Sequence, residues 1–286
     1  MNYTYIDSGQ KLSTYIENLA ENKTEMLALD IEGESNLHQY GEKLCLVQLY
    51  DGKDAVIIDP FKTSMKELKK ILENRSILKI MFDAPGDRAF LYKNCRIDTM
   101  SILDIQAAVL LLEYEKRDLS SVLKQALQID TKKSKKKFQQ YNWNTRPLSD
   151  RAIEYALEDV IHLFELKDLL LSELVEQDLL ERFILKNLQG QNKPHIYNKK
   201  PKLLRSRNFR ELTTQEQGVF KKLFEIRENN ARKLNCPPHY LLPNDLLFTL
   251  VTLKKKLQSS DFGKRIPPRD RQKIIPLMQQ AINKDK

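Results

Sequence analysis

The run MLALDIEGES, residues 26–35, constrains the fold of this chain most, because it joins a strand signal to two carboxylates. Its apolar, β-rich start, MLALDI, is typical of a buried strand. Side chains alternate across a strand, so Asp30 and Glu32 project from the same face. Burying an unpaired carboxylate is costly, and two like charges side by side need a cation or a proton between them. The run therefore predicts a core strand with a shared acidic site on one face.

Strand and helix signals alternate through the first half of the chain. The DGKD stretch, residues 51–54, indicates a hairpin turn, so the first strands should be antiparallel. Such an alternation is typical of an α/β domain with a mixed sheet. We expect strands at 26–31, 44–50, 55–59 and 77–82, and helices at 64–73, 86–93, 99–112 and 118–127.

The second half begins with a basic, polar run at 131–147, after which a long helical pattern starts behind Ser149, its expected N-cap. Residues 191–210 hold prolines, many basic residues and few apolar ones, which indicates a linker. Further on, helical patterns near 213–234, 243–256 and 270–282 predict a small all-helical bundle. We expect three parts: an α/β domain at 1–190, a basic linker at 191–210 and a helical domain at 211–286.

Charge is distributed unevenly along the chain. Residues 1–192 carry a net charge of −5, whereas residues 193–286 hold 22 Lys/Arg against eight Asp/Glu, a net charge of +14. A segment this basic indicates a polyanionic partner, although a solubilising surface is the alternative. Three widely spaced cysteines argue against a disulfide framework or a zinc site. With no signal-peptide pattern and no apolar run of about 18 residues, we expect a cytoplasmic protein that does not span a membrane.

Two further carboxylates occupy unusual places. Asp87 lies just past an expected strand and near the start of a helix, and Asp159 lies among apolar residues of the long helix. Tyr155 precedes Asp159 by four residues, which puts both on one helix face. Four carboxylates from separate segments suit two hard cations such as Mg²⁺ or Mn²⁺, a pair that promotes in-line phosphoryl displacement. Spacing alone does not choose between Asp83 and Asp87.

Taken together, the motifs resemble ribonuclease D, of the DEDD superfamily of 3′→5′ exonucleases, in the branch with a tyrosine in its last motif. The resemblance is carried by LALDIEGE, LCLVQLYDG, KIMFDAPGDRAFLY, DTMSILDIQAA, WNTRPLS and YALEDVIHL. The tail, LTTQEQGVFKKLFEIRENNARKLNCPPHYLLPNDLLFTL, resembles the helicase-and-RNase-D C-terminal (HRDC) domain. The resemblance implies that residues 1–190 form a 3′→5′ exonuclease domain with a ribonuclease H-like, DnaQ-like α/β fold. It also implies that residues 211–286 form an HRDC-like helical nucleic-acid-binding domain.

The resemblance also implies roles for individual residues. Asp30, Glu32, Asp87 and Asp159 would bind two divalent metal ions, Mg²⁺ or Mn²⁺, and Tyr155 would position the attacking water. The helix that continues after Asp87 matches the family pattern, which favours Asp87 over Asp83.

The implied activity is hydrolysis of RNA from single-stranded 3′ ends to nucleoside 5′-monophosphates, in the 3′ processing of tRNA and other structured RNA. An exonuclease acting on DNA is the nearest alternative, because two-metal hydrolysis does not require the 2′-hydroxyl. A catalytically silent nucleic-acid-binding protein would normally have lost a metal ligand. A glycosidase with a carboxylate pair would explain neither the basic tail nor the Tyr-Asp pair. We expect a monomer.

Basic residues are the candidates for binding the phosphate backbone regardless of sequence. Binding of this kind weakens as the salt concentration rises. The run at 132–147 interleaves lysines with aromatic residues, as expected where bases stack, although Trp143 suits a packing anchor better. The candidates for nucleic-acid binding are Lys136, Lys137, Arg146, Lys199, Lys200, Lys202, Arg205, Arg207, Lys254, Lys255 and Lys256.

Overall fold

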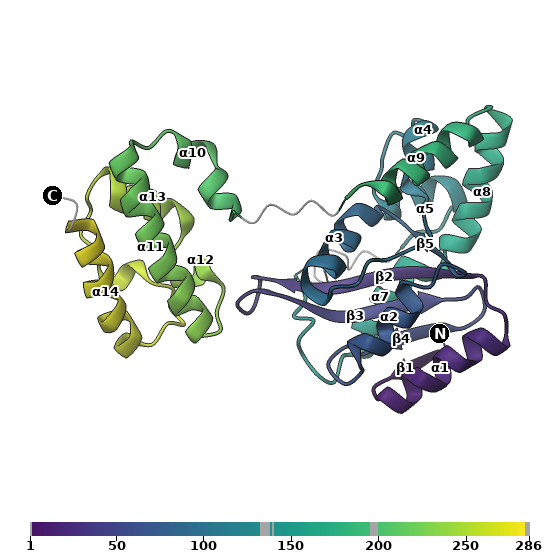
Figure 1. Ribbon diagram of the computed structural model, residues 1–286, viewed down its shortest axis with the longest axis horizontal. Coiled ribbons are helices and arrows are strands. Elements are labelled where there is room, and N and C mark those ends of the chain that lie inside the picture. The colour runs from purple at the N-terminus through teal and green to yellow at the C-terminus, as the bar shows by residue number, and fades with distance from the viewer. Residues whose placement is uncertain (1, 132–137, 139, 195–199, 284–286) are drawn as a thin grey trace. The chain divides into compact units, whose positions relative to one another are not determined.

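The structure is a computed structural model that describes residues 2–131, 138, 140–194 and 200–283 (Figure 1). Three candidates for nucleic-acid binding, Lys136, Lys137 and Lys199, lie outside the described residues. The chain divides into two compact units. The first unit comprises Met1–Gly33 and Lys43–Tyr197, and the second comprises Glu34–Glu42 and Asn198–Lys286.

A six-stranded sheet in the order β1-β4-β3-β2-β5-β6 is the frame of the first unit. β3 pairs with β4 antiparallel, as the turn at 51–54 predicted, whereas β1–β4, β2–β5 and β5–β6 are parallel pairs. The predicted mixed sheet is therefore confirmed. Its strands are β1 (Tyr3–Ile6), β2 (Met26–Ser35), β3 (Glu42–Tyr50), β4 (Ala55–Ile58), β5 (Leu78–Met81) and β6 (Ile102–Asp104).

The two edge strands, β1 and β6, were not predicted. β1 has four residues, of which only Ile6 is buried, so it lacks the apolar run that marks a core strand. β6 has three residues, and the expectation of a helix over 99–112 was wrong there, because the helix begins only at Gln106. Both strands depend on pairing with distant parts of the chain, which local periodicity does not report.

Helices cover both faces of the sheet, and the alternation of side chains along β2 separates two cores. Leu27 packs in one core with α1, α2 and α3, whereas Ala28 packs in the other with α4, α5, α7 and α8. Asp30 and Glu32 lie on the same face of β2 as Ala28, so they face α7. The helices of this unit are α1 (Gly9–Glu21), α2 (Met65–Leu72), α3 (Ala84–Cys95), α4 (Gln106–Leu111), α5 (Leu119–Leu127), α7 (Asp150–Ile161), α8 (Leu163–Glu176) and α9 (Leu180–Asn192).

The long helix expected after Ser149 is divided into α7, α8 and α9. Ser149 is the N-cap of α7, as predicted, and its Oγ accepts a hydrogen bond from the Ala152 N–H at 3.3 Å. α7 ends at Ile161, and His162 separates it from α8. The helical spacing of apolar residues continues across this break, so the sequence does not reveal it.

The second unit has a helical core of its own. α11 begins at a capping box formed by Thr213 and Glu216. α13 ends at Thr252, earlier than expected, so Lys254, Lys255 and Lys256 lie beyond the helix. Its described helices are η1 (Lys202–Arg205), α10 (Arg207–Arg210), α11 (Thr214–Lys233), α12 (Pro238–Leu241), α13 (Asn244–Thr252), η2 (Ser259–Asp261) and α14 (Pro268–Asn283); the first two lie within the expected linker.

Among the described residues, each helix is too short or too polar to cross a lipid bilayer.

Candidate active site

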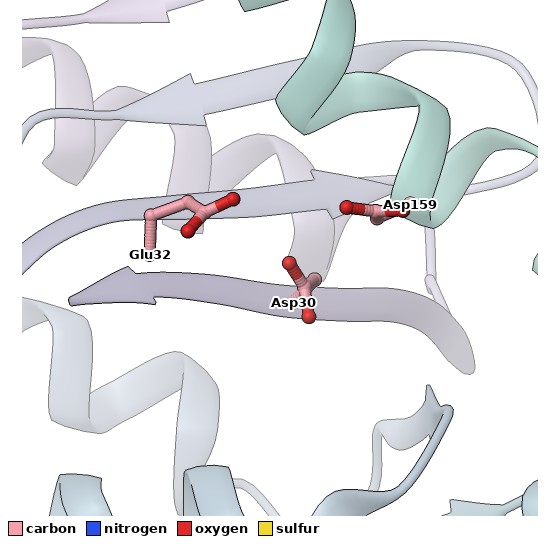
Figure 2. Close-up of side chains that lie close together, drawn as sticks. All are labelled: Asp30, Glu32 and Asp159. Atoms are coloured by element: carbon pink, nitrogen blue, oxygen red, sulfur yellow. The ribbon is translucent and has the colours of Figure 1, made fainter. Parts of the chain in front are cut away.

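Three carboxylates meet between the sheet and α7. Asp30 and Glu32 come from the middle of β2, and Asp159 comes from the last turn of α7 (Figure 2). One carboxylate oxygen from each side chain lies within 4.8 Å of the other two. Three carboxylate oxygens this close could hold a hard divalent cation.

The local sequence explains why these side chains converge. Leu27, Leu29 and Ile31 fill the core on the opposite face of β2, and this fixes the face on which Asp30 and Glu32 project. On α7, Ala156 and Val160 are fully buried against the sheet, so the neighbouring Asp159 is carried toward β2.

Asp87 lies in the first turn of α3. Its negative charge contributes to raising the pKa of both Asp30 and Glu32, which shows that it lies within electrostatic reach of them. Burial, followed by the charges of Asp83 and Asp104, raises the pKa of Asp87 itself to about 7. Asp83 is exposed in front of the helix. Asp87, rather than Asp83, therefore acts electrostatically on the two β2 carboxylates, while the close cluster itself consists of Asp30, Glu32 and Asp159.

The start of α3 is held by an unusual cap. Asp83 has φ 62° and ψ 49°, in the left-handed region, and its own side chain caps nothing. Instead, the Asp104 carboxylate of β6 accepts the N–H of Asp83 at 3.0 Å and that of Ala84 at 3.2 Å. The same carboxylate accepts the Gln106 N–H at 3.1 Å. Asp104 therefore anchors the helix that carries Asp87, a role that sequence reasoning missed because the residue lay in an expected helix.

The electrostatics of the site favour cations. Burial is the main cause that raises the pKa of Asp30 well above its usual range, and Asp87, Asp159 and Glu32 add to it. Burial also raises the pKa of Glu32, and the negative charges of Asp159 and Asp87 raise it further. A bound divalent cation would lower these pKa values again, because it stabilises the charged carboxylates that burial and repulsion disfavour. The residues present therefore fit the divalent metals that the sequence implied.

Tyr155 lies one turn before Asp159 on α7 and is partly buried. Its ring stacks on Phe138, with centroids 5.1 Å apart and planes 23° apart, and lies 6.2 Å from the Trp143 ring. Burial, and after it the charges of Asp159, Glu32 and Asp30, raises the pKa of the phenol. Tyr155 thus remains a neutral hydroxyl, able to donate a hydrogen bond beside the carboxylates.

Arg146 is fully engaged inside the first unit. Its five N–H groups donate to the Asp59 carboxylate and to the backbone oxygens of Trp143, Thr145 and Cys45. No donor is left over for a phosphate in this arrangement. The geometry gives no support to the prediction that Arg146 contacts nucleic acid, and Trp143 is buried as a packing anchor.

The other described candidates for nucleic-acid binding are exposed residues of the second unit. Arg207 pairs with Glu211 at 2.6 Å, and Lys255 pairs with Asp261 at 2.9 Å. These ion pairs lie at the surface, so they compete only weakly with a phosphate. The exposed set is Lys200, Lys202, Arg205, Arg207, Lys254, Lys255 and Lys256.

Comparison with protein families identifies both parts of the chain. A family model described as 3′-5′ exonuclease matches residues 3–175, and the HRDC domain model matches residues 216–257. Among curated proteins, the exosome complex component 10 homolog of Caenorhabditis elegans is 27% identical over 257 residues. That match covers 86% of this chain but only 28% of the relative. Ribonuclease D of Desulfotalea psychrophila is 23% identical over 255 residues, covering 86% of this chain and 67% of the relative.

Solved structures share the fold. The catalytic core of RRP6 from Trypanosoma brucei superposes with a TM-score of 0.79 at 20% identity, covering 99% of this chain and 79% of that one. RNase D of Escherichia coli, titled an exoribonuclease involved in structured RNA processing, gives a TM-score of 0.74 at 21% identity, covering 99% of this chain and 76% of that one.

Proposed function

The chain belongs to the 3′-5′ exonuclease family and carries an HRDC domain, and on that premise we propose that it is a metal-dependent 3′→5′ exoribonuclease. The observation that carries the proposal is the convergence of Asp30, Glu32 and Asp159 within 4.8 Å. Asp87 acts on the first two electrostatically. A family member that had become a mere binding protein would be expected to lose part of this acidic set, and here the whole set is present.

The four carboxylates would hold two divalent ions, Mg²⁺ or Mn²⁺, because hard cations prefer oxygen ligands. When bound, such ions lower the pKa of a water and stabilise the attacking and leaving oxygens of an in-line displacement. The protein's part is to supply negative charge at fixed positions: two groups on one strand, one on α7 and one on α3. Since the three supporting elements belong to one packed unit, the ligand geometry is set before metal arrives.

Tyr155 would orient the attacking water. Its neutral hydroxyl donates a hydrogen bond to the water oxygen, which fixes a lone pair toward the terminal phosphorus. The water oxygen bonds to phosphorus and releases one proton to solvent, while the bond between phosphorus and the 3′-oxygen of the preceding nucleotide breaks and that oxygen takes up one proton from solvent. The products are a nucleoside 5′-monophosphate and an RNA one nucleotide shorter.

We propose RNA, with single-stranded 3′ ends of tRNA precursors and other structured RNAs, as the substrate. The support is the set of relatives, which includes ribonuclease D and exosome components. The exposed basic residues of the second unit would hold the phosphate backbone without reading its sequence. DNA is the second candidate, because nothing in the acidic site selects for a 2′-hydroxyl. We further propose that the protein is a cytoplasmic monomer. The free thiols of Cys45, Cys95 and Cys236 are as expected in a reducing compartment.

The test uses a 5′-labelled single-stranded RNA and a DNA of the same sequence, each incubated with the protein in Mg²⁺, Mn²⁺ or EDTA. We expect a ladder that shortens from the 3′ end of the RNA, present with metal and absent with EDTA. Equal ladders on both substrates would favour the general 3′-exonuclease. Intact substrates that still bind the protein would contradict the enzyme.

A further inference from the structure

We propose that Arg146 is a positioning residue for Tyr155: it clamps the loop whose aromatic rings hold the Tyr155 phenol beside the carboxylates. The inference rests on the proposed exonuclease function and adds a residue to its machinery. The contacts that Arg146 makes with Asp59 and with three backbone oxygens are called the Arg146 clamp below.

The sheet side of the clamp is an ion pair with Asp59, which directly follows β4. Arg146 Nε donates to Asp59 Oδ2 at 2.7 Å, and Nη2 donates to Oδ1 at 3.0 Å. The Asp59 side chain is 1% exposed, and it also accepts the Phe61 N–H at 2.9 Å and the Tyr5 hydroxyl at 3.2 Å. A two-pronged pair with a buried, further-bonded carboxylate fixes the guanidinium in direction as well as in place.

The loop side of the clamp consists of backbone oxygens. Arg146 Nη1 donates to the Trp143 oxygen at 2.8 Å and to the Thr145 oxygen at 2.9 Å. Nη2 donates to the Cys45 oxygen, on β3, at 2.6 Å. One side chain thus joins β3, the end of β4 and the loop before α7, with every donor used.

The clamped loop covers the Tyr155 ring. Trp143, whose carbonyl the clamp holds, is 4% exposed, and its ring lies 6.2 Å from that of Tyr155. Tyr141 links this ring to Phe138, with centroid separations of 4.9 Å and 5.6 Å. Phe138 in turn stacks on Tyr155 at 5.1 Å. The phenol is therefore packed by two rings whose own positions depend on the loop.

The clamp also lies close to the start of α7. Arg146 precedes Ser149, the N-cap of that helix, by three residues, and the helix carries both Tyr155 and Asp159. Loosening the clamp would let the aromatic rings move and the Tyr155 hydroxyl shift. A displacement of about 1 Å in a positioning group can reduce a rate about 100-fold. Lysine cannot replace arginine here, because it lacks the planar fork that binds several acceptors at once.

The deciding experiment is a double-mutant cycle between R146K and Y155F, read by single-turnover hydrolysis of RNA in Mn²⁺. Y155F keeps the ring and its packing but removes the hydroxyl. We expect each single variant to slow hydrolysis by about 100-fold while the RNA dissociation constant changes less than about twofold. If Arg146 acts through Tyr155, R146K should add little in the Y155F background. R151K, at an exposed position of α7, is the matched control and should hydrolyse as the wild type does.

The single tryptophan, Trp143, gives a second readout that needs no activity. In R146K its emission should shift to the red, and acrylamide should quench it more, because the ring leaves its buried place. If R146K does not fold, D59N, which weakens the same pair from the other side, replaces it.

Several results would overturn the proposal. One is that the losses in rate of R146K and Y155F multiply in the double variant, and another is that Trp143 emission is unchanged in a folded R146K. Either result would show that Arg146 does not act through the loop. A weakened RNA dissociation constant that accounts for the whole loss would make it a substrate contact. If the wild type hydrolyses nothing, the proposed function fails, whereas the emission test still decides whether the clamp holds the loop.

Discussion

The backbone N–H of Asp104 donates to Oδ1 of Asn187 at 2.7 Å, which ties the edge strand β6 to α9. One helical turn further on, Gln191 Oε1 accepts the Ile102 N–H at 3.2 Å. Two amide side chains thus accept backbone N–H groups at the open edge of the sheet, where a further strand would otherwise pair. Since the Asp104 carboxylate caps α3, this edge also supports the helix that carries Asp87.

Replacing Asn187 by alanine should destabilise the first unit. Asn187 is 8% exposed, and its loss leaves the Asp104 N–H without its partner. An unsatisfied buried donor costs about 1–3 kcal/mol, so urea unfolding should show a loss of that size. N192A, at an exposed position of the same helix, is the control and should change stability by less than about 0.5 kcal/mol. Equal stability of the two variants would contradict the role of this bond.

Gly33 leaves room on β2 for the ring of Phe90, a residue of α3. A Cβ at this position would lie 2.8 Å from Cζ of Phe90, on α3. We expect G33A to displace the Phe90 ring, to shift α3 through it and so to weaken Mn²⁺ binding, because α3 carries Asp87. Calorimetric titration with Mn²⁺ measures this directly, and F90A should restore binding to the G33A variant by removing the clash.

G9A is the matched control for this substitution, because none of the described residues lies within 4 Å of a Cβ built at Gly9. If G33A binds Mn²⁺ as well as G9A does, the packing of Phe90 against Gly33 does not position Asp87.

Lys79 predicts a pH dependence of stability. The side chain is fully buried in β5, where Nζ donates to the Asn74 oxygen at 2.5 Å and to the Ile77 oxygen at 2.7 Å. Burial lowers its pKa from 10.5 to about 8. Between these values the unfolded chain holds the proton more tightly, so the contribution of Lys79 to stability should rise with pH. Below pH 8 this contribution should be flat.

The measurement is urea unfolding of the wild type and of K79M at several pH values between 7 and 10. The difference in the free energy of unfolding isolates Lys79 from the other titrating groups. It should grow in favour of the wild type above pH 8, and a constant difference would contradict a lowered pKa.

The exposed lysines after α13 should contribute to the salt dependence of RNA binding. The double variant K254A/K256A removes two charges that are exposed on the second unit. With single-stranded RNA, every phosphate that the variant no longer neutralises should reduce the slope of log K against log salt by about 0.7. K66A, on α2 of the first unit, serves as the charge control. A slope that stays the same in K254A/K256A would remove these lysines from the interface.

Local spacing predicts the carboxylates on β2 and α7, because strand and helix periods alone determine which side chains share a face. Asp30 with Glu32, and Tyr155 with Asp159, are such pairs. The choice of Asp87 over Asp83 could not be made in this way, because it depends on the left-handed turn at Asp83 and on a cap from another strand.

Long-range contacts account for what the sequence did not reveal. The partners of Arg146, Asp59 and Cys45, lie 87 and 101 positions earlier, so in the sequence Arg146 looks like one more cation of a basic loop. β6 is equally hidden, because the side chain that satisfies Asp104 lies 83 positions away. Periodicity reports which residues share a face of one element, but not which elements meet.

The most direct test of the account compares D30N with the wild type in two measurements on the same RNA: the 3′-shortening ladder in Mn²⁺, and the dissociation constant. Asp30 is a metal ligand in this account, and asparagine keeps its size while removing its charge. We predict that D30N loses the ladder and binds RNA within about twofold of the wild type, since the binding surface is unchanged. A ladder that persists in D30N would contradict the assignment of the acidic site as the active site.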